Sequence, residues 1–234
     1  MALERFKAEM EKLSGKKITD ASLRRSIEMH NEIRGLLREL YLLRKQDPPP
    51  ISGSEALDVA LAATLLPRDE VAPLLRQLLT EIKARKAPER SGPRILVTGS
   101  VLDNPTLLRM VEEESGVVVA NDLCTTMRNF WYRIDDDTDT LEAIYQFQNK
   151  RPLCACMNPP EVRFDYLMEL IREFKVDAVI YFNMKYCHPF LYEAPLFQRK
   201  LQAQGIPTIF LETGHDLSGL GQLRTRIQAF IEML

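Results

Sequence analysis

The fold is decided by residues 163–187, which read RFDYLMELIREFKVDAVIYFNMKYC. Apolar residues at helical spacing over 163–174 predict an amphipathic helix, and the unbroken apolar run 178–182 predicts a buried strand. A cysteine, Cys187, follows this strand after a short turn. A helix that leads into a buried strand is typical of the βαβ units from which parallel sheets are built.

The same alternation extends in both directions from this unit. We predict further strands at 94–98, 117–120 and 206–211, and further helices at 106–114, 195–204 and 221–234. Strands that alternate with helices of these lengths imply right-handed crossovers and a parallel sheet. The sequence therefore predicts an α/β fold with a doubly wound, mainly parallel four-stranded sheet.

Residues 1–90 are predicted to be helical. Thr19 offers a helix start, three prolines at 48–50 end the helix that follows, and Ser52 is placed to cap the next helix. A linker at 87–93 contains two prolines and a glycine. We therefore divide the chain into a helical segment, 1–90, and an α/β domain, 91–234.

Composition limits the classes of protein. Hydrophobic residues make up 45% and charged residues 27% of the 234, with a net charge of −2, as in a soluble globular protein. Neither half has the basic excess of a nucleic-acid binder, and no apolar run has the length of a membrane span. The N-terminus lacks the apolar stretch of a signal peptide, so we expect a cytoplasmic protein. In that compartment the four cysteines are expected to be thiols, metal ligands or redox groups rather than disulfides.

The positions of these cysteines are the main functional signal. Cys124 follows the strand 117–120 and Cys187 follows 178–182, while Cys154 and Cys156 follow a weaker strand candidate at 151–153. If these strands are parallel, all four thiols gather near the carboxyl edge of the sheet, where ligands bind in open α/β folds. We expect Cys124 and Cys187 on neighbouring strands. Any single one of these cysteines could instead be a small buried hydrophobe.

Three other residues are candidates for binding substrate. Gly99 and Ser100 form a turn after the strand 94–98, beside a helix N-terminus, where backbone N–H groups suit a phosphate or a carbonyl oxygen. An ordinary tight turn is the alternative. Lys185 places a cation two residues before Cys187.

Several strings recur in an order that resembles a known family. They are DPPPISG at 47–53, GSVLDNP at 99–105, NDLC at 121–124, MKYC at 184–187 and GQLRTR at 221–226. Together they resemble the B/C-type (D-component) subunits of the 2-hydroxyacyl-CoA dehydratase / benzoyl-CoA reductase family, over nearly the whole chain.

The resemblance implies a cofactor, partners and a reaction. Members bind a [4Fe–4S] cluster through cysteine thiolates, work with a homologous second subunit, and receive single electrons from a separate ATP-dependent iron–sulfur activator. The acyl-CoA thioester is reduced to a ketyl radical, from which water is eliminated; in the reductases an aromatic ring is reduced instead. By this resemblance Cys187 matches a cluster ligand, and Cys124 and Cys156 are further candidate ligands. No catalytic side chain is identified.

The resemblance also raises an expectation about the length of the chain. Family subunits begin with another α/β domain, which supplies two of the three cluster cysteines and much of the acyl-CoA pocket, whereas this chain begins inside the helical middle segment. We expect the C-terminal part of a split subunit, a truncated product or an engineered fragment, with the cluster shared with a further domain or chain. The alternatives are a benzoyl-CoA reductase-type subunit and a non-catalytic scaffold or regulatory remnant of the same fold.

Overall fold

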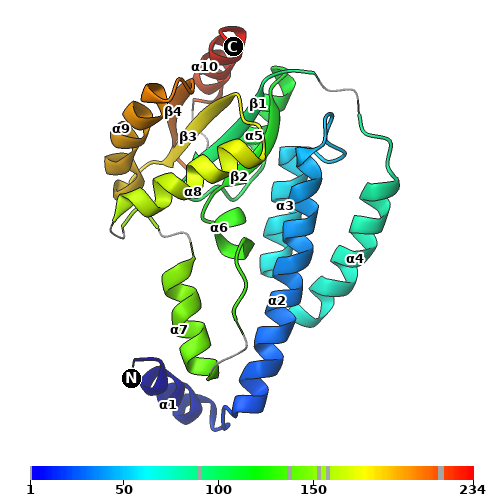
Figure 1. Ribbon diagram of the computed structural model, residues 1–234, viewed down its shortest axis with the longest axis vertical. Helices are drawn as coiled ribbons and strands as arrows, with labels where there is room; N and C mark the ends of the chain where they lie inside the picture. Colours follow the sequence, from blue (N-terminus) through cyan, green and yellow to red (C-terminus); the bar gives the residue numbers. More distant parts are fainter. Residues whose placement is uncertain (1, 89–90, 136–138, 152–153, 157–158, 216–218) are drawn as a thin grey trace.

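The computed structural model describes residues 2–88, 91–135, 139–151, 154–156, 159–215 and 219–234, and in it a group of helices precedes an α/β unit (Figure 1). The first group is α1 (Ala2–Ser14), α2 (Asp20–Leu42), the 3-10 helix η1 (Leu43–Lys45), α3 (Gly53–Leu65) and α4 (Arg68–Ala84). The strands are β1 (Arg94–Gly99), β2 (Val117–Asp122), β3 (Ala178–Met184) and β4 (Thr208–Thr213). The helices among and after them are α5 (Thr106–Glu113), α6 (Met127–Phe130), α7 (Thr140–Lys150), α8 (Pro160–Glu173), α9 (His188–Ala203) and α10 (Leu220–Glu232).

The four strands form one parallel sheet in the order β2-β1-β3-β4, which confirms the predicted fold class. Helices cover both faces. On one face, α5 and α10 pack on side chains such as Val97 and Ile180; on the other, α8 and α9 pack on Leu96 and Val179. Neighbouring residues of a strand thus belong to two different cores, as the alternation of side chains in a strand requires.

The first group of helices packs on the sheet beside β2. Ser52 caps α3 in a capping box with Glu55, as the sequence predicts for an N-cap serine. Arg44, fully buried, donates to Asn121 Oδ1 of β2 at 3.2 Å. Because α2, α3 and α4 share one hydrophobic cluster with the sheet, the division at 1–90 and 91–234 stays a prediction.

Some element boundaries differ from the predicted ones. The helix expected from 195 begins at His188, because Pro189 rather than Pro195 occupies its first turn. The helix α7 was not predicted from the sequence. No strand contains Arg151 or Cys154, and Pro152 and Leu153 lie outside the described residues. In the described ranges no helix is both long and apolar enough to cross a membrane.

Candidate functional site

The carboxyl edge of the sheet carries most of the predicted site residues. Gly99 ends β1, Cys124 follows β2 and Cys187 follows β3. The prediction that Cys124 and Cys187 follow neighbouring strands is wrong, because β1 lies between β2 and β3. Within the sheet, the connection that follows β1 leads to β2 in one direction, whereas the connection that follows β3 leads to β4 in the opposite direction. The two cysteines therefore flank a topological switch point, the place where open α/β sheets bind ligands.

Three thiols lie close to one another at this edge. Cys124, Cys154 and Cys187 are half-buried and pack on the same hydrophobic cluster. Burial raises the pKa of Cys124, and the nearby Cys154 and Cys187 add to that effect while Arg128 opposes it. Cys156 is exposed, and a hydrogen bond with Cys154 raises the pKa of its thiol.

These thiols are the right kind of ligand for an iron–sulfur cluster, but they do not form a complete set of ligands for one. Sulfur is the donor that such clusters take from proteins. Within the described part of the chain, however, no group of three or more His, Cys, Asp or Glu residues is arranged to hold a metal ion. The chain thus presents soft ligands near one another, and a cluster there would need ligands from elsewhere or a rearrangement of these loops.

Gly99 and Ser100 hold strand ends together. Gly99 has a φ of +137°, and a Cβ atom there would lie 1.8 Å from the carbonyl oxygen of Phe182, so only glycine fits. Ser100 is fully buried: its N–H donates to Phe182 O at 3.0 Å, and its Oγ accepts from the Met184 N–H at 2.6 Å. Its carbonyl accepts from the Cys124 N–H at 3.4 Å. Substrate binding by Gly99 and Ser100 stays a prediction.

The turn after β3 positions Lys185 and Cys187. The N–H of Lys185 donates to Thr213 O at 2.9 Å, and the N–H of Cys187 donates to Met184 O at 3.0 Å. Tyr186 between them has a φ of +71° and is exposed. Cys187 is the N-cap residue of α9, so its thiol lies at the positive end of a long helix.

A buried ion pair lies directly beneath Cys124. Arg128 of α6 donates to Asp122 through Nε at 3.2 Å and Nη2 at 2.8 Å, and its Nη1 donates to Cys124 Sγ at 3.5 Å. Thr98 donates to the same carboxylate at 2.9 Å. Burial alone would raise the pKa of Asp122, but the charges of Arg128 and Arg163 and these hydrogen bonds outweigh burial and lower it.

A second buried pair continues this network. Arg163 of α8 donates to Glu193 of α9 at 2.8 and 3.0 Å and lies 3.9 Å from Asp122. Tyr181 of β3 donates to Glu193 at 2.7 Å, and burial together with this carboxylate raises the pKa of Tyr181. Arg128 and Arg163 each lie 5.0 Å from the centre of the Phe190 ring. The network joins α6, α8 and α9 to the sheet under the thiols.

This network was not predicted from the sequence, although the sequence carries a signal for it. Arg163 falls on the buried stripe of α8, with Tyr166, Leu167 and Leu170, and Glu193 falls on the buried stripe of α9. A charge on the apolar stripe of a helix indicates a buried partner, because an unpaired buried charge is strongly unfavourable.

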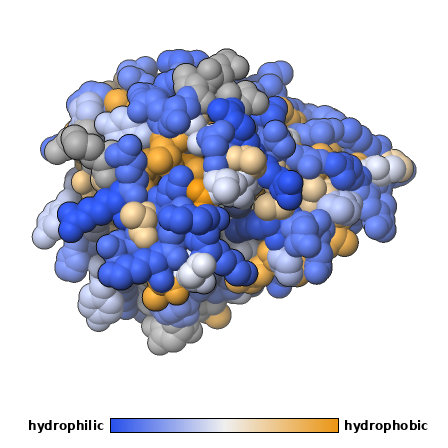
Figure 2. Space-filling model, turned by 90° about the horizontal axis from the view of Figure 1, so that it is seen from below, coloured by the Kyte–Doolittle hydropathy of each residue, from blue (hydrophilic) through white to orange (hydrophobic). Residues whose placement is uncertain are grey.

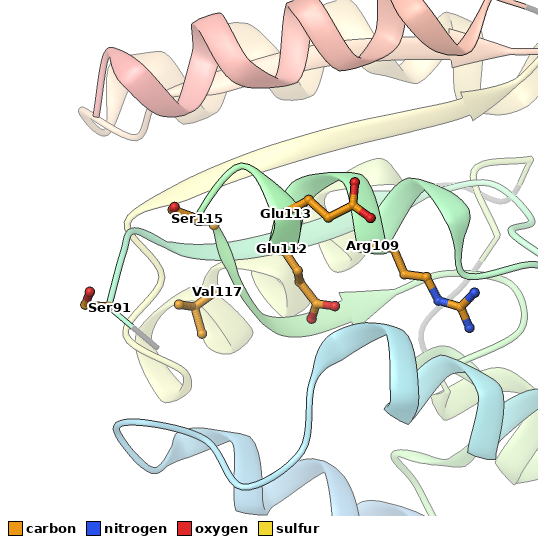
Figure 3. A pocket seen from close by; sticks show the side chains of 7 residues that line it. Ser91, Arg109, Glu112, Glu113, Ser115 and Val117 are labelled. Carbon is orange, nitrogen blue, oxygen red and sulfur yellow. The ribbon is translucent and has the colours of Figure 1, made fainter. Parts of the chain in front are cut away.

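A cavity of about 440 Å³ opens at the opposite, amino edge of the sheet, with Arg109, Glu112 and Glu113 in its lining (Figure 3). Glu112 points toward the first group of helices, where its carboxylate accepts from the Gly53 N–H and the Ser54 hydroxyl, both at 2.6 Å. Glu113 pairs with Arg224 of α10, and Arg109 pairs with Asp58 of α3 at 3.2 Å. These side chains join elements to one another, so the cavity is a weaker candidate than the thiol edge.

Comparisons with known proteins show the family of the chain. A family model described as "2-hydroxyglutaryl-CoA dehydratase, D-component" matches residues 1–234. The (R)-phenyllactyl-CoA dehydratase beta subunit of Clostridium sporogenes is 30% identical over 97% of this chain and 60% of its own length. The beta subunit of (R)-2-hydroxyglutaryl-CoA dehydratase of Acidaminococcus fermentans is 26% identical, over 100% of this chain and 63% of its own length. A benzoyl-CoA reductase subunit of Thauera aromatica is 24% identical, over 99% of this chain and 61% of its own length. The chain thus spans about three fifths of the length of these curated relatives.

Proposed function

Because the chain belongs to the 2-hydroxyglutaryl-CoA dehydratase D-component family, we propose that it is a subunit, or part of a subunit, of an iron–sulfur 2-hydroxyacyl-CoA dehydratase. Its reaction would be the radical elimination of water from an acyl-CoA thioester. The observation that carries the proposal is that Cys154 and Cys187 lie near enough to Cys124 to act on the charge of its thiolate, beside the switch point of the sheet.

We assign Cys187 as a ligand of a [4Fe–4S] cluster, with Cys124 and Cys156 as further candidates. When bound, such a cluster supplies a Lewis-acidic iron and single-electron transfer, which no amino-acid side chain provides. Cys187 presents its sulfur at the N-terminus of α9, which favours the negative charge of thiolate ligands. Arg128 supplies a fixed cation and an N–H donor to Cys124 Sγ. Lys185 is exposed at the same edge and would approach the thioester or a partner chain.

The proposal includes partners. The relatives from Clostridium sporogenes and Acidaminococcus fermentans are beta subunits, which supports a second, homologous subunit for this chain as well. We propose that the cluster is shared with a further domain or chain, since the described thiols do not form a complete metal site. An ATP-dependent iron–sulfur activator would deliver the electron.

The second candidate is a benzoyl-CoA reductase-type subunit, which the relative from Thauera aromatica favours. Both candidates use an acyl-CoA thioester and single electrons. The dehydratase is preferred because the (R)-phenyllactyl-CoA dehydratase beta subunit has the higher identity, 30% against 24%. Turnover of a 2-hydroxyacyl-CoA against benzoyl-CoA by the reconstituted complex distinguishes them.

The test of the proposal is Cys187→Ser in the complex with the second subunit and the activator. We expect loss of the cluster and of turnover, because serine is a poor ligand for iron at neutral pH whereas the thiolate is a soft donor. The fold should survive, since the change is nearly isosteric and costs less than about 1.5 kcal/mol. Iron content, turnover and thermal melting are measured together.

Cys154→Ser is the matched control, because Cys154 packs on the same cluster of side chains but is not an assigned ligand. It should retain iron and most of the activity. Full iron content and activity in Cys187→Ser would contradict the assignment. A wild-type complex that binds no iron would favour the scaffold alternative.

A further inference from the structure

Two arginines of α2 lie over aromatic rings. The guanidinium of Arg34 lies 4.6 Å from the centre of the Phe147 ring of α7, and that of Arg38 lies 5.0 Å from the centre of the Trp131 ring. The two arginines are four residues apart and therefore share one face of α2. Stacking on a ring fixes the plane of a guanidinium and leaves its N–H edge available for a ligand.

Neither arginine has a carboxylate partner among the residues that the structure describes. The Arg34 side chain donates to Asn31 Oδ1, a neutral acceptor, at 3.4 Å. Two acidic side chains of the same helix are paired with α4: Glu32 binds Arg76, and Glu39 binds Lys83 at 2.5 Å. Within the described residues, ion pairs join α2 to α4 and join Arg24 to Asp20 of the same helix, and none of these pairs includes Arg34 or Arg38.

Two further arginines lie near Arg34. Arg151 is the C-cap residue of α7, and Arg68, which donates to the carbonyls of Ala63 and Thr64, lies at the start of α4. Burial and the charges of Arg151 and Arg68 lower the pKa of Arg34 to about 10, so it stays protonated at neutral pH. His30 lies one turn before Arg34. Burial and the charges of Arg34 and Arg68 lower the pKa of His30. Several fixed positive charges therefore repel one another, and a bound anion would relieve that repulsion.

We propose that Arg34 and Arg38, stacked one turn apart on α2, form a binding site for the phosphate groups of an organic phosphate or diphosphate, which we call the arginine face. Planar guanidinium groups bind phosphate oxygens in pairs of hydrogen bonds, and two such groups one turn apart suit a ligand with more than one phosphoryl group. Figure 2 shows the molecule from below, where apolar residues are exposed in patches within a mostly hydrophilic surface.

The helix α6 connects the arginine face to the thiol edge. Arg128 in α6 contacts Cys124, and Trp131, the C-cap residue of the same helix, lies under Arg38. A ligand with a thioester at one end and phosphates at the other, joined by a flexible arm, could reach both. Coenzyme A has this form. Its choice as the ligand rests on the proposed function, whereas the anion site itself does not.

Titration calorimetry with coenzyme A, dephospho-coenzyme A, inorganic diphosphate and pantetheine tests the site in the full chain. We expect the three phosphate-bearing probes to bind, pantetheine not to bind, and affinity to fall as salt rises. Arg34→Met should weaken binding about tenfold or more, and Arg34→Lys less, since lysine keeps the charge but not the paired donors. Trp131 is the only tryptophan, so its emission should change when Arg38 binds an anion.

Arg25→Met is the matched control, because Arg25 is an exposed arginine of the same helix outside the arginine face. It should bind all probes as the wild type does, and melting curves check that each variant folds. Tighter binding of coenzyme A than of diphosphate assigns the site to the thioester substrate; equal binding assigns it to a free phosphate anion. Absence of phosphate binding in the wild type, or equal binding in Arg34→Met, overturns the arginine face. That result would leave iron binding at Cys187 unaffected, so the two proposals fail separately.

Discussion

At the residue scale, the buried carboxylate of Asp122 controls the interior beneath the thiols. It accepts hydrogen bonds from Thr98 and Arg128 and lies near Arg163. Asp122 and these three residues are all buried. Removing one partner of a buried ion pair leaves an uncompensated charge, which is far more unfavourable than losing the pair as a whole. The geometry of α6, and with it the contact of Arg128 to Cys124, therefore depends on Asp122.

We expect Asp122→Asn to lower the free energy of unfolding by about 3–5 kcal/mol at neutral pH. The folded-state pKa of Asp122 is lowered, so its contribution is present above the unfolded pKa of about 3.9 and is lost as pH falls through the folded value. The difference between wild type and variant should shrink as the solution is made more acidic than about pH 4. Urea unfolding across this pH range measures it.

Asp165→Asn is the control for that measurement, because Asp165 is an exposed carboxylate of α8. It should change stability by less than about 0.5 kcal/mol. An equal effect of the two substitutions, or a penalty for Asp122→Asn that does not depend on pH, would contradict the role given to the buried pair.

At the element scale, the first turn of α3 approaches the sheet more closely than a side chain allows. A Cβ atom on Gly53 would lie 2.5 Å from the Cβ atom of Val118 in β2. The N–H of Gly53 meets the carboxylate of Glu112 in α5, so the helix start is fixed to two elements of the α/β unit. Glycine at this position therefore sets how the helices sit on the sheet.

We expect Gly53→Ala to destabilise the protein by about 1–3 kcal/mol, because the added methyl overpacks this contact. Val118→Ala in the same chain removes the Cγ1 atom, which would also lie 2.5 Å from the added methyl, and should recover part of the loss. The matched control is Gly35→Ala in α2, where nothing lies within 4 Å of the added Cβ. That change should stabilise the helix by about 0.5–1 kcal/mol. Thermal or urea unfolding compares the three variants, and equal effects of Gly53→Ala and Gly35→Ala would contradict the close approach.

At the scale of the whole molecule, the sheet order places the thiols around a switch point but leaves their set incomplete. Cys124 and Cys187 lie after strands separated by β1, and the loop of Cys154 and Cys156 lies after α7. Iron–sulfur clusters need several thiolates held together, and metal binding is strongest where the fold positions all of them.

We therefore expect the chain alone, prepared without oxygen, to fold and to carry little or no iron. Iron and sulfide analysis with absorbance spectroscopy measures this, and circular dichroism checks the fold. Addition of the second subunit during cluster reconstitution should raise the iron content. A stoichiometric [4Fe–4S] cluster in the chain alone would contradict the shared site and point to Cys124, Cys154 and Cys156 as ligands beside Cys187.

The sequence predicted the elements better than the contacts between them. Apolar runs and helix caps identified the four strands, the start of α3 at Ser52 and the end of the helix before the prolines, because these depend on neighbouring residues. It did not identify α7, nor the pairing of Asp122 with Arg128 and of Arg163 with Glu193. Such partners come from different elements, and local periodicity carries no information about which charges meet.

By itself the sequence determined that strands and helices alternate after residue 93 and that Cys124 and Cys187 follow strands, since both are local properties of the chain. Parallel strands then put both cysteines at one edge of the sheet. Only the tertiary structure decided that β1 lies between their strands, because strand order depends on which way each crossover turns and on how two cores pack. Only the tertiary structure, too, placed Arg34 and Arg38 on aromatic rings from a distant part of the chain, without carboxylate partners in the described residues.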